Sequence, residues 1–332
     1  MQTQVKKIDT QSIAEAKEIL LAGGVVAIPT ETVYGLGGNA FDDNAVQQIF
    51  AVKGRPADNP LIAHVHKDYD LLQIIDYDTE VAKKLREAFL PGPLTLVYPS
   101  TGKVSKYVSC GLNTLAVRVP SHAGAQALLK AVNLPVVAPS ANLSRHVSPT
   151  SAKHVFDDFA GAIPLILDGG EAEGGIESTV CDVTGDVPVI LRPGLVTREQ
   201  IAAVCGDCLV YEHKEGSGEK VKSPGVLYKH YSPRCETALF LDVATAKEFL
   251  QAKQGRIGVL CERALLDSFA GYIAYDLGGT PEEMAANLYA LLRKAEEECD
   301  LLVAIEPKQK GGVMDGLLNR LRKACTSKDV KH

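Results

Sequence analysis

The chain has 332 residues, a length that exceeds one typical hydrophobic core and suits two domains. Its hydrophobic content of 46% and charged content of 23% are ordinary for a globular protein, and no apolar run approaches the roughly 18 residues of a membrane-spanning helix. The net charge of −6 argues against a protein whose main task is to grip a long nucleic-acid backbone, because neutralised phosphates supply most of that affinity. These totals exclude membrane insertion, but they are compatible with local basic patches.

The N-terminus and the cysteines indicate a cytoplasmic protein. Residues 1–7 lack the apolar core of a signal peptide, and the eight cysteines have no disulfide-framework spacing, which fits reduced thiols. Cys205 and Cys208 form a single C-x-x-C pair without a partner pair. We interpret this pair as incidental rather than as a zinc or redox site, because structural zinc sites usually combine two such pairs of ligands.

The first two thirds of the chain alternate between helical and strand patterns. Thr10 or Ser12 can cap a helix that ends at Gly23, and residues 25–28 follow as a buried strand. Asp42 opens a second helix. The remaining patterns predict an α/β domain over residues 1–205, with a helix at 78–89 and strands at 61–65, 94–98, 115–119, 135–138, 164–167, 178–183 and 187–191.

Residues 206–234 lose this periodicity and gather Gly, Ser and Lys, which predicts a linker. A shorter alternation then predicts a small second α/β domain over residues 235–332. Its expected strands are 238–241, 257–260, 272–275 and 301–305, and its expected helices are 244–253, 282–297 and 313–324. No internal repeat or low-complexity tract interrupts either domain.

A charged loop lies between the second helix and the next strand. Residues 53–61 contain Lys53, Arg55 and Asn59, while one Gly and two Pro forbid a regular helix or strand. Lysine and arginine suit phosphate or carboxylate oxygens better than a packed core. The loop is therefore a candidate anion site, and a solvated basic turn is the alternative.

Polar residues recur where predicted strands begin or end. In open α/β sheets ligands bind at strand ends, so these residues could share one crevice. Simple turn caps, loop hydrogen bonds and a satisfied strand-end histidine are the alternatives. The residues in question are Thr30, Thr32, His64, Ser140, Asn142, Ser144, Glu177, Ser178 and Arg192.

Arg118 is harder to explain as an ordinary surface residue. It lies within residues 115–119, a predicted buried strand, where an unpaired guanidinium is prohibitive. It therefore needs a carboxylate, and the sequence leaves open whether the protein or a small anionic ligand supplies it. The chain has no P-loop and no dinucleotide-binding glycine motif, and residues 35–38 form only a glycine cluster.

Several ordered motifs together resemble the YrdC-type threonylcarbamoyl-AMP synthases in their long, two-domain form. These motifs are Pro29–Gly35, Lys53-x-Arg55-Pro56, Asn59-Pro60-Leu61, Ser140-Ala141-Asn142-x-Ser144 and the linker segment 223–233. The resemblance spans residues 10–234, whereas residues 235–332 match only in size and pattern. Val226 stands where methionine is expected, an apolar-for-apolar change.

The resemblance implies a fold and a reaction. The fold would be a YrdC-like twisted open mixed sheet with flanking helices, followed by a smaller Rossmann-like α/β domain. L-Threonine, bicarbonate and ATP would give threonylcarbamoyl-AMP and pyrophosphate. A downstream transferase complex would then place the threonylcarbamoyl group on adenosine 37 of tRNAs that read codons beginning with A. Mg²⁺ would arrive with ATP, because no carboxylate cluster dictates a protein-bound metal.

The resemblance also assigns site residues. Lys53 and Arg55 would be the catalytic cations that face the ATP phosphates. The nucleotide pocket would be completed by Asn59, Thr114, Ser140, Asn142, Ser148, Arg192, Tyr228 and Tyr231, and the threonine site would be formed by Thr32, His64, Arg118, Ala138 and Ser178. The polar aromatic residues of 228–231 favour a lid over a mere tether for the linker.

Two other classes of protein stay open at this point. One is a module that binds double-stranded RNA or tRNA, against which the acidic total argues; a weak tRNA contact by the enzyme is a separate expectation. The other is a carbamoyltransferase of the hydrogenase-maturation type, which contains a similar domain and additional C-x-x-C pairs. ATP-dependent consumption of bicarbonate with threonine, rather than of carbamoyl phosphate, would separate that class from a synthase.

Overall fold

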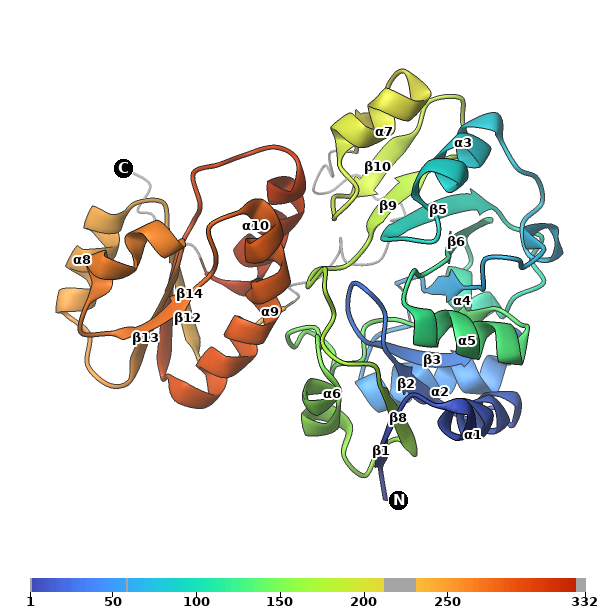
Figure 1. Cartoon of the computed structure of the whole chain (residues 1–332), viewed down its shortest axis with the longest axis horizontal. Helices are drawn as coiled ribbons and strands as arrows, with labels where there is room; N and C mark the ends of the chain where they lie inside the picture. The colour runs from blue at the N-terminus through green and yellow to red at the C-terminus, as the bar shows by residue number, and fades with distance from the viewer. Residues whose placement is uncertain (1, 58, 212–230, 327–332) are drawn as a thin grey trace.

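The computed structural model describes residues 2–57, 59–211 and 231–326. Within these ranges no helix has the length and apolar character needed to cross a membrane. Two sheets organise the described chain, a large mixed sheet and a small parallel sheet, and each is flanked by helices (Figure 1). The expected twisted mixed sheet and smaller Rossmann-like unit are therefore confirmed.

The large sheet has the strand order β1-β8-β2-β3-β7-β4-β6-β5-β9-β10-β11. Neighbours such as β4 and β6 are parallel, whereas β5 and β6 are antiparallel, so the sheet is mixed. Its strands are β1 (Gln4–Lys7), β2 (Val26–Ile28), β3 (Gly35–Asn39), β4 (Ile62–His64), β5 (Leu94–Pro99), β6 (Thr114–Arg118), β7 (Val136–Val137), β8 (Leu165–Asp168), β9 (Thr179–Asp182), β10 (Val189–Arg192) and β11 (Leu209–Val210).

Helices cover both faces of this sheet because successive strand residues point to opposite sides. In β2, Ala27 joins the core under α2, α3, α6 and α7, whereas Val26 and Ile28 join the core under α1 and α5. The helices of this part are α1 (Thr10–Leu21), α2 (Asp43–Lys53), α3 (Glu80–Phe89), α4 (Lys106–Ser109), α5 (Ala123–Val132), α6 (Ala152–Phe159) and α7 (Arg198–Cys205), with a short 3-10 turn η1 (Leu71–Gln73).

The predicted helices and strands of residues 1–205 are confirmed to within a few residues at their ends. The cap of α1 differs from the prediction. Asp9, rather than Thr10 or Ser12, is the N-cap: its carboxylate accepts from the Ser12 amide at 2.7 Å, and the Ser12 hydroxyl accepts from the Asp9 amide at 2.9 Å. This reciprocal capping box satisfies two amide groups that a helix start would otherwise leave without partners.

Within residues 1–205, two strands had no sequence signal. β1 is short and mostly exposed, so it lacks the apolar alternation of a strand. β3 is the glycine cluster, whose composition disfavours strands in general. Here the glycines allow close approach, because a Cβ on Gly35 would lie 2.9 Å from that of Ala138 and a Cβ on Gly38 would lie 2.9 Å from the Ile49 side chain. β3 can therefore lie between β2 and β7 while α2 packs directly on it.

The small sheet has the all-parallel order β12-β15-β13-β14. Its strands are β12 (Glu236–Phe240), β13 (Ile257–Cys261), β14 (Ile273–Asp276) and β15 (Leu301–Ile305). Helix α8 (Val243–Gln251) and the 3-10 segment η2 (Arg263–Phe269) lie on one face, and α9 (Pro281–Glu298) and α10 (Val313–Ala324) lie on the other. All the predicted elements of this part are confirmed.

The α9–α10 layer faces the larger part of the chain (Figure 1). Val33, Val147 and Ile176 share one apolar core with residues of these two helices. The backbones approach closely at Gly175, where a Cβ would lie 2.3 Å from the Ala285 carbonyl oxygen, and Gly175 also has a φ of +68° that favours glycine. The two parts are thus packed against each other through a continuous core.

The segment between the two sheets is only partly described. β11 pairs with β10, so the large sheet extends past residue 205, where the first domain was expected to end. Tyr228 and most of the predicted linker lie outside the described residues. The chain is described again from Tyr231, whose side chain is buried.

Candidate active site

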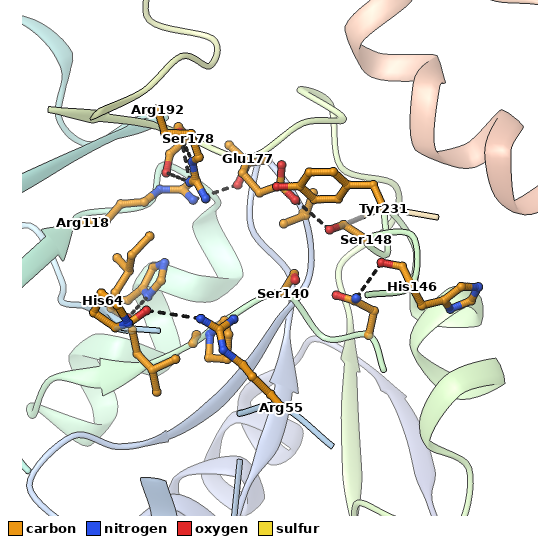
Figure 2. Close-up of a pocket in the computed structure, with 18 residues that line it drawn as sticks. Arg55, His64, Arg118, Ser140, His146, Ser148, Glu177, Ser178, Arg192 and Tyr231 are labelled. Carbon is orange, nitrogen blue, oxygen red and sulfur yellow. Dashed lines mark hydrogen bonds between the residues drawn. The ribbon is translucent and has the colours of Figure 1, made fainter. Parts of the chain in front are cut away.

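Polar residues from the strand ends of the large sheet line one cavity, together with a loop and the start of the second part. Figure 2 shows Arg118 and Arg192 approaching each other near Ser178, with His64 and Arg55 across the cavity. The predicted site residues that line it are Thr32, Arg55, His64, Arg118, Ala138, Ser140, Asn142, Ser148, Ser178, Arg192 and Tyr231. The sequence therefore predicted most of the lining of this cavity, although what these residues bind is a separate question.

Sheet register explains why residues far apart in sequence meet here. β4 and β6 are parallel, and their register places His64 beside Arg118. β5 and β6 are antiparallel and place Thr95 beside Arg118, while β9 begins next to Ser178. Each strand therefore delivers a polar side chain to the same edge of the sheet.

Arg118 has a carboxylate partner within the protein. One terminal nitrogen lies 2.8 Å from a Glu31 oxygen, and the other donates to the Thr32 hydroxyl at 2.8 Å. Burial alone would raise the pKa of Glu31, but the charge and side-chain hydrogen bond of Arg118 together with backbone hydrogen bonds outweigh burial, so the pKa lies below its usual range. The question that the sequence left open is thus answered in part: a buried ion pair exists, and its guanidinium lines the cavity.

His64 is neutral in this environment. Burial and the nearby Arg118 charge lower its pKa to about 3. Its Nδ1 lies 3.2 Å from the Ile62 carbonyl oxygen, which can only accept, so we assign the proton to Nδ1. The Nε2 atom is then an acceptor, suited to a hydroxyl or amine donor.

Ser178 and Arg192 form a second fixed pair. Arg192 donates to the Ser178 carbonyl oxygen at 2.9 Å, and the Ser178 hydroxyl lies 2.8 Å from that of Thr95. Burial and the neighbouring Arg320 charge lower the pKa of Arg192. Arg118 and Arg192, together with Arg55, therefore place three guanidinium groups on one cavity, which favours an anionic ligand.

Lys53 does not line this cavity. Its ammonium is buried and donates at 2.5 Å to the carbonyl oxygens of Ser140 and Asn142, and burial together with the Arg55 charge holds its pKa well below the usual value. Lys53 borders a smaller adjoining pocket, shared with Arg55 and Asn59. In this structure it fixes the loop at residues 140–142, which the motif alone did not indicate.

The smaller pocket contains buried acceptors that have no hydrogen-bond partner among the described residues. These are the side-chain oxygens of Asn59 and Asn142. The Asn142 amide nitrogen, by contrast, donates to the Leu143 and His146 carbonyls. Because buried polar atoms are almost always paired, such oxygens indicate a place for a donor from a ligand or water.

Two predicted residues stand apart from the rest. Thr114 begins β6, at the opposite end of that strand from Arg118, and lines neither pocket. Tyr228 lies outside the described residues. Tyr231, by contrast, lines the cavity and stacks on Tyr289 with ring centroids 5.3 Å apart.

Three cavity or near-cavity residues were given no role by the resemblance, although Glu177 was among the strand-end candidates. Glu31 pairs with Arg118, His146 bonds to Asp158 and Glu296, and Glu177 bonds to Ser148. The partners of His146 and Glu177 include residues more than 100 positions away in α9 and α10. No local sequence pattern reports such pairs, although Glu177 does directly precede a strand.

The cysteines and carboxylates indicate no metal centre among the described residues. Cys205 and Cys208 are both free thiols, and the described residues contain no group of three or more metal-ligating side chains.

The chain is similar to known proteins along most of its length. A family profile named Sua5_yciO_yrdC and described as telomere recombination matches residues 18–194, and the profile of the threonylcarbamoyl-AMP synthase C-terminal domain matches residues 196–326. The fold and site thus define a two-domain α/β protein, and the chain belongs to the YrdC-like family of threonylcarbamoyl-AMP synthases in its long form. It is an enzyme of the nucleotidyltransferase type.

Individual relatives cover nearly the whole chain. The threonylcarbamoyl-AMP synthase of Pyrococcus abyssi is 40% identical over 98% of this chain and 97% of its own length. That of Bacillus subtilis is 41% identical over 96% of this chain and 94% of its own. The crystal structure of P. abyssi Sua5 complexed with L-threonine has a TM-score of 0.88 at 39% identity, covering 97% of this chain and 96% of that one.

Proposed function

We propose that this enzyme makes L-threonylcarbamoyl-AMP and pyrophosphate from L-threonine, bicarbonate and ATP. The observation that carries the proposal is one cavity bordered by Arg118 and Arg192 that adjoins a pocket bordered by Arg55. The names of the relatives and the threonine complex of the P. abyssi protein support it. We further propose residues 1–205 as the catalytic domain, 206–234 as a linker and lid, and 235–332 as a second domain.

The threonine side of the cavity is assigned to Thr32, His64, Arg118, Ala138 and Ser178. Arg118 can pair with the carboxylate of the amino acid while it keeps its bond to Glu31, because a guanidinium offers five donors. The neutral His64 offers Nε2 as an acceptor for the hydroxyl or amino group. The Ser178 hydroxyl is held by Thr95 and can both donate and accept.

The nucleotide side is assigned to Arg55, Asn59, Thr114, Ser140, Asn142, Ser148, Arg192, Tyr228 and Tyr231. Arg55 supplies charge for the phosphates, and the buried oxygens of Asn59 and Asn142 can accept from nucleotide amino or hydroxyl groups. Lys53 acts with Arg55, and we now assign it the task of fixing the 140–142 loop against which the nucleotide would bind.

The chemistry needs no protein nucleophile. The threonine amine adds to bicarbonate with loss of water to give a carbamate, whose oxygen then attacks the α-phosphorus of ATP. A new carbamate O–P bond forms, the bond to the β-phosphate bridging oxygen breaks, and pyrophosphate leaves. Positioning and charge neutralisation supply the rate enhancement, and Mg²⁺ that arrives with ATP would add to the neutralisation.

The product would supply a transferase complex that modifies adenosine 37 of tRNAs reading ANN codons. A mixed anhydride hydrolyses readily, so the enzyme must deliver it to a partner that consumes it quickly. We propose the cytoplasm, where tRNA is modified, as the compartment. A weak contact with tRNA or double-stranded RNA would be secondary, because the chain is acidic overall.

The test is a reconstitution with the purified full chain. Pyrophosphate release and the mass of threonylcarbamoyl-AMP are measured with ATP, bicarbonate and threonine, and then with each omitted. We expect product only with all three. Turnover that requires carbamoyl phosphate instead would favour the carbamoyltransferase alternative, and RNA binding without turnover would favour a binding module.

A further inference from the structure

Glu177 connects the cavity to the second domain. It lines the cavity next to Ser178, and its carboxylate is surrounded by three partners. One oxygen accepts from the Ser148 hydroxyl at 2.7 Å, as Figure 2 shows. The other oxygen accepts from two residues of the α9–α10 layer, which the predicted site did not include.

Arg320 of α10 is the first of these residues. Its side chain is fully buried, with 0% of its surface exposed, and its Nε lies 3.1 Å from the second Glu177 oxygen. The same guanidinium also donates to the Pro193 carbonyl oxygen, one residue after Arg192. Arg320 therefore bonds both to Glu177, which precedes Ser178, and to Pro193, which follows Arg192.

Tyr289 of α9 is the second residue. Its hydroxyl donates to the same Glu177 oxygen at 2.9 Å, and its ring stacks on Tyr231, which lines the cavity. Both tyrosines are buried. The second domain thus contacts the cavity wall through one cation, one hydroxyl and one aromatic face.

The position of Glu177 matters because Arg192 is also near. Burial alone would raise the pKa of Glu177, but the charges of Arg320 and Arg192 and the Ser148 hydrogen bond outweigh it and lower the pKa to about 2. Glu177 is therefore a carboxylate. Without Arg320 and Tyr289, this buried anion would be left with the charge of Arg192, which also acts on it. A turn of the carboxylate toward Arg192 would disturb both Ser148 and the Arg192–Ser178 bond.

We propose that Arg320 and Tyr289 are positioning residues for the active site. By holding Glu177, they keep the Ser148 hydroxyl fixed and leave Arg192 on Ser178, so that the nucleotide side is preorganised. The inference rests on the proposed function and goes beyond it, because it gives the second domain a defined part in the geometry of the site. It also explains why a basic side chain on a mainly apolar face of α10 is fully buried.

The alternative is that these contacts only dock the two domains. A matched control exists in Glu296, a half-buried residue of α9 that bonds across the same interface to His146 at 2.8 Å and is not among the described partners of Glu177. The variant Glu296→Gln weakens docking and keeps the shape of the side chain. The variant Tyr289→Phe removes one hydroxyl and keeps both the ring and its stacking on Tyr231.

The experiment compares full-length Tyr289→Phe, Arg320→Lys and Glu296→Gln with the unchanged chain. Five quantities are measured: the thermal unfolding midpoint, the affinities for L-threonine and for ATP by calorimetry, and kcat and KM for ATP. We expect Tyr289→Phe and Arg320→Lys to lower kcat/KM for ATP by on the order of 10- to 100-fold, as small misplacements in a site do. L-Threonine affinity should be kept, and Glu296→Gln should keep kcat/KM.

Two outcomes would overturn the inference. Unchanged ATP affinity and kinetics in Tyr289→Phe would show that Glu177 needs no such support, even if Arg320→Lys failed to fold. An equal loss of kcat/KM in Glu296→Gln would reduce the contacts to domain docking. If the unchanged chain bound ATP and threonine without forming the adenylate, the proposed function would fail, while the two affinities would still test the positioning.

Discussion

The two walls of the cavity are built in different ways. The wall that we propose for threonine, made by Thr32, His64, Arg118 and Ser178, comes from strand ends and loops of the large sheet, and its main bonds stay within residues 1–205. The adjoining wall, around Ser148 and Glu177, is completed by side chains from α9 and α10. The bonds that fix the first wall are made within the large-sheet part of the chain, whereas the geometry of the second wall depends on how the two parts pack.

The largest expected effect concerns the choice of amino acid by the wall that we propose for threonine. A site that hydrogen-bonds a substrate hydroxyl rejects the analogue lacking it by on the order of 10⁴-fold. We therefore expect valine to be a very poor substrate in a pyrophosphate-release assay. Serine keeps the hydroxyl and lacks one methyl group, so its kcat/KM should fall by only about 10- to 200-fold. Equal efficiency with all three amino acids would contradict the assigned residues.

The next largest expected effect concerns Arg118, which pairs with Glu31 inside the protein and is proposed to bind the threonine carboxylate. Removing it as Arg118→Leu should abolish most activity and cost about 3 to 5 kcal/mol of stability, because the buried Glu31 carboxylate loses its partner. The double variant Glu31→Gln with Arg118→Leu should regain much of the stability in urea unfolding and none of the activity. Recovery of activity in the double variant would make Arg118 a purely structural residue.

The difference between the walls also decides what the sequence could predict. Strand ends and short motifs are local, so most cavity residues, Arg118 and His64 among them, could be named from the sequence. The direction of the Lys53 side chain could not, since the carbonyls that bind it belong to a loop 87 and 89 residues away. Glu177 was visible as a polar residue before a strand, but its bonds to Arg320 and Tyr289 depend on domain packing that leaves no periodic signal. The sequence did not predict β3, because glycine disfavours strands in general and is present here to let neighbouring elements approach closely.

Lys53 and Arg55, which both border the smaller pocket, allow this difference between local motifs and long-range contacts to be tested. The motif alone suggests that alanine at either position lowers activity and leaves the fold intact. For Arg55, which is partly exposed, the structure agrees with that expectation. Arg55→Ala should lower adenylate formation by on the order of 10²-fold and leave stability unchanged. Lys53→Ala should instead also cost roughly 1 to 3 kcal/mol, because two buried carbonyls lose their donor.

Thermal unfolding and pyrophosphate release distinguish the two variants directly. Lys53→Met serves as the control that keeps the volume of the side chain and removes its donors. If Lys53→Ala and Arg55→Ala were equally stable, the ammonium would not fix the 140–142 loop.

The smallest expected effect is a pH dependence of the interface between the domains. His146 bonds to Asp158 at 3.0 Å and to Glu296 at 2.8 Å, with Arg293 and Arg234 also near Asp158. Burial lowers the pKa of His146, but the two carboxylate hydrogen bonds outweigh it and raise the pKa above 6.5. The pKa values of Asp158 and Glu296 are lowered, since burial is outweighed by their bonds to His146 and, for Asp158, to Arg293.

When folding raises the pKa of a group, the group stabilises the folded state fully at pH values below its pKa in the unfolded chain. This contribution is lost as the pH rises through its pKa in the folded chain. His146 should therefore stabilise the chain most below pH 6.5 and progressively less above it, while both carboxylates stay charged down to about pH 4. Relative to His146→Gln, the unchanged chain should gain roughly 1 to 3 kcal/mol at pH 5.5 and much less at pH 9, as judged from thermal midpoints. A difference between the two proteins that stays constant across this range would mean that His146 is neutral at the interface and that packing alone joins the second domain to the cavity wall.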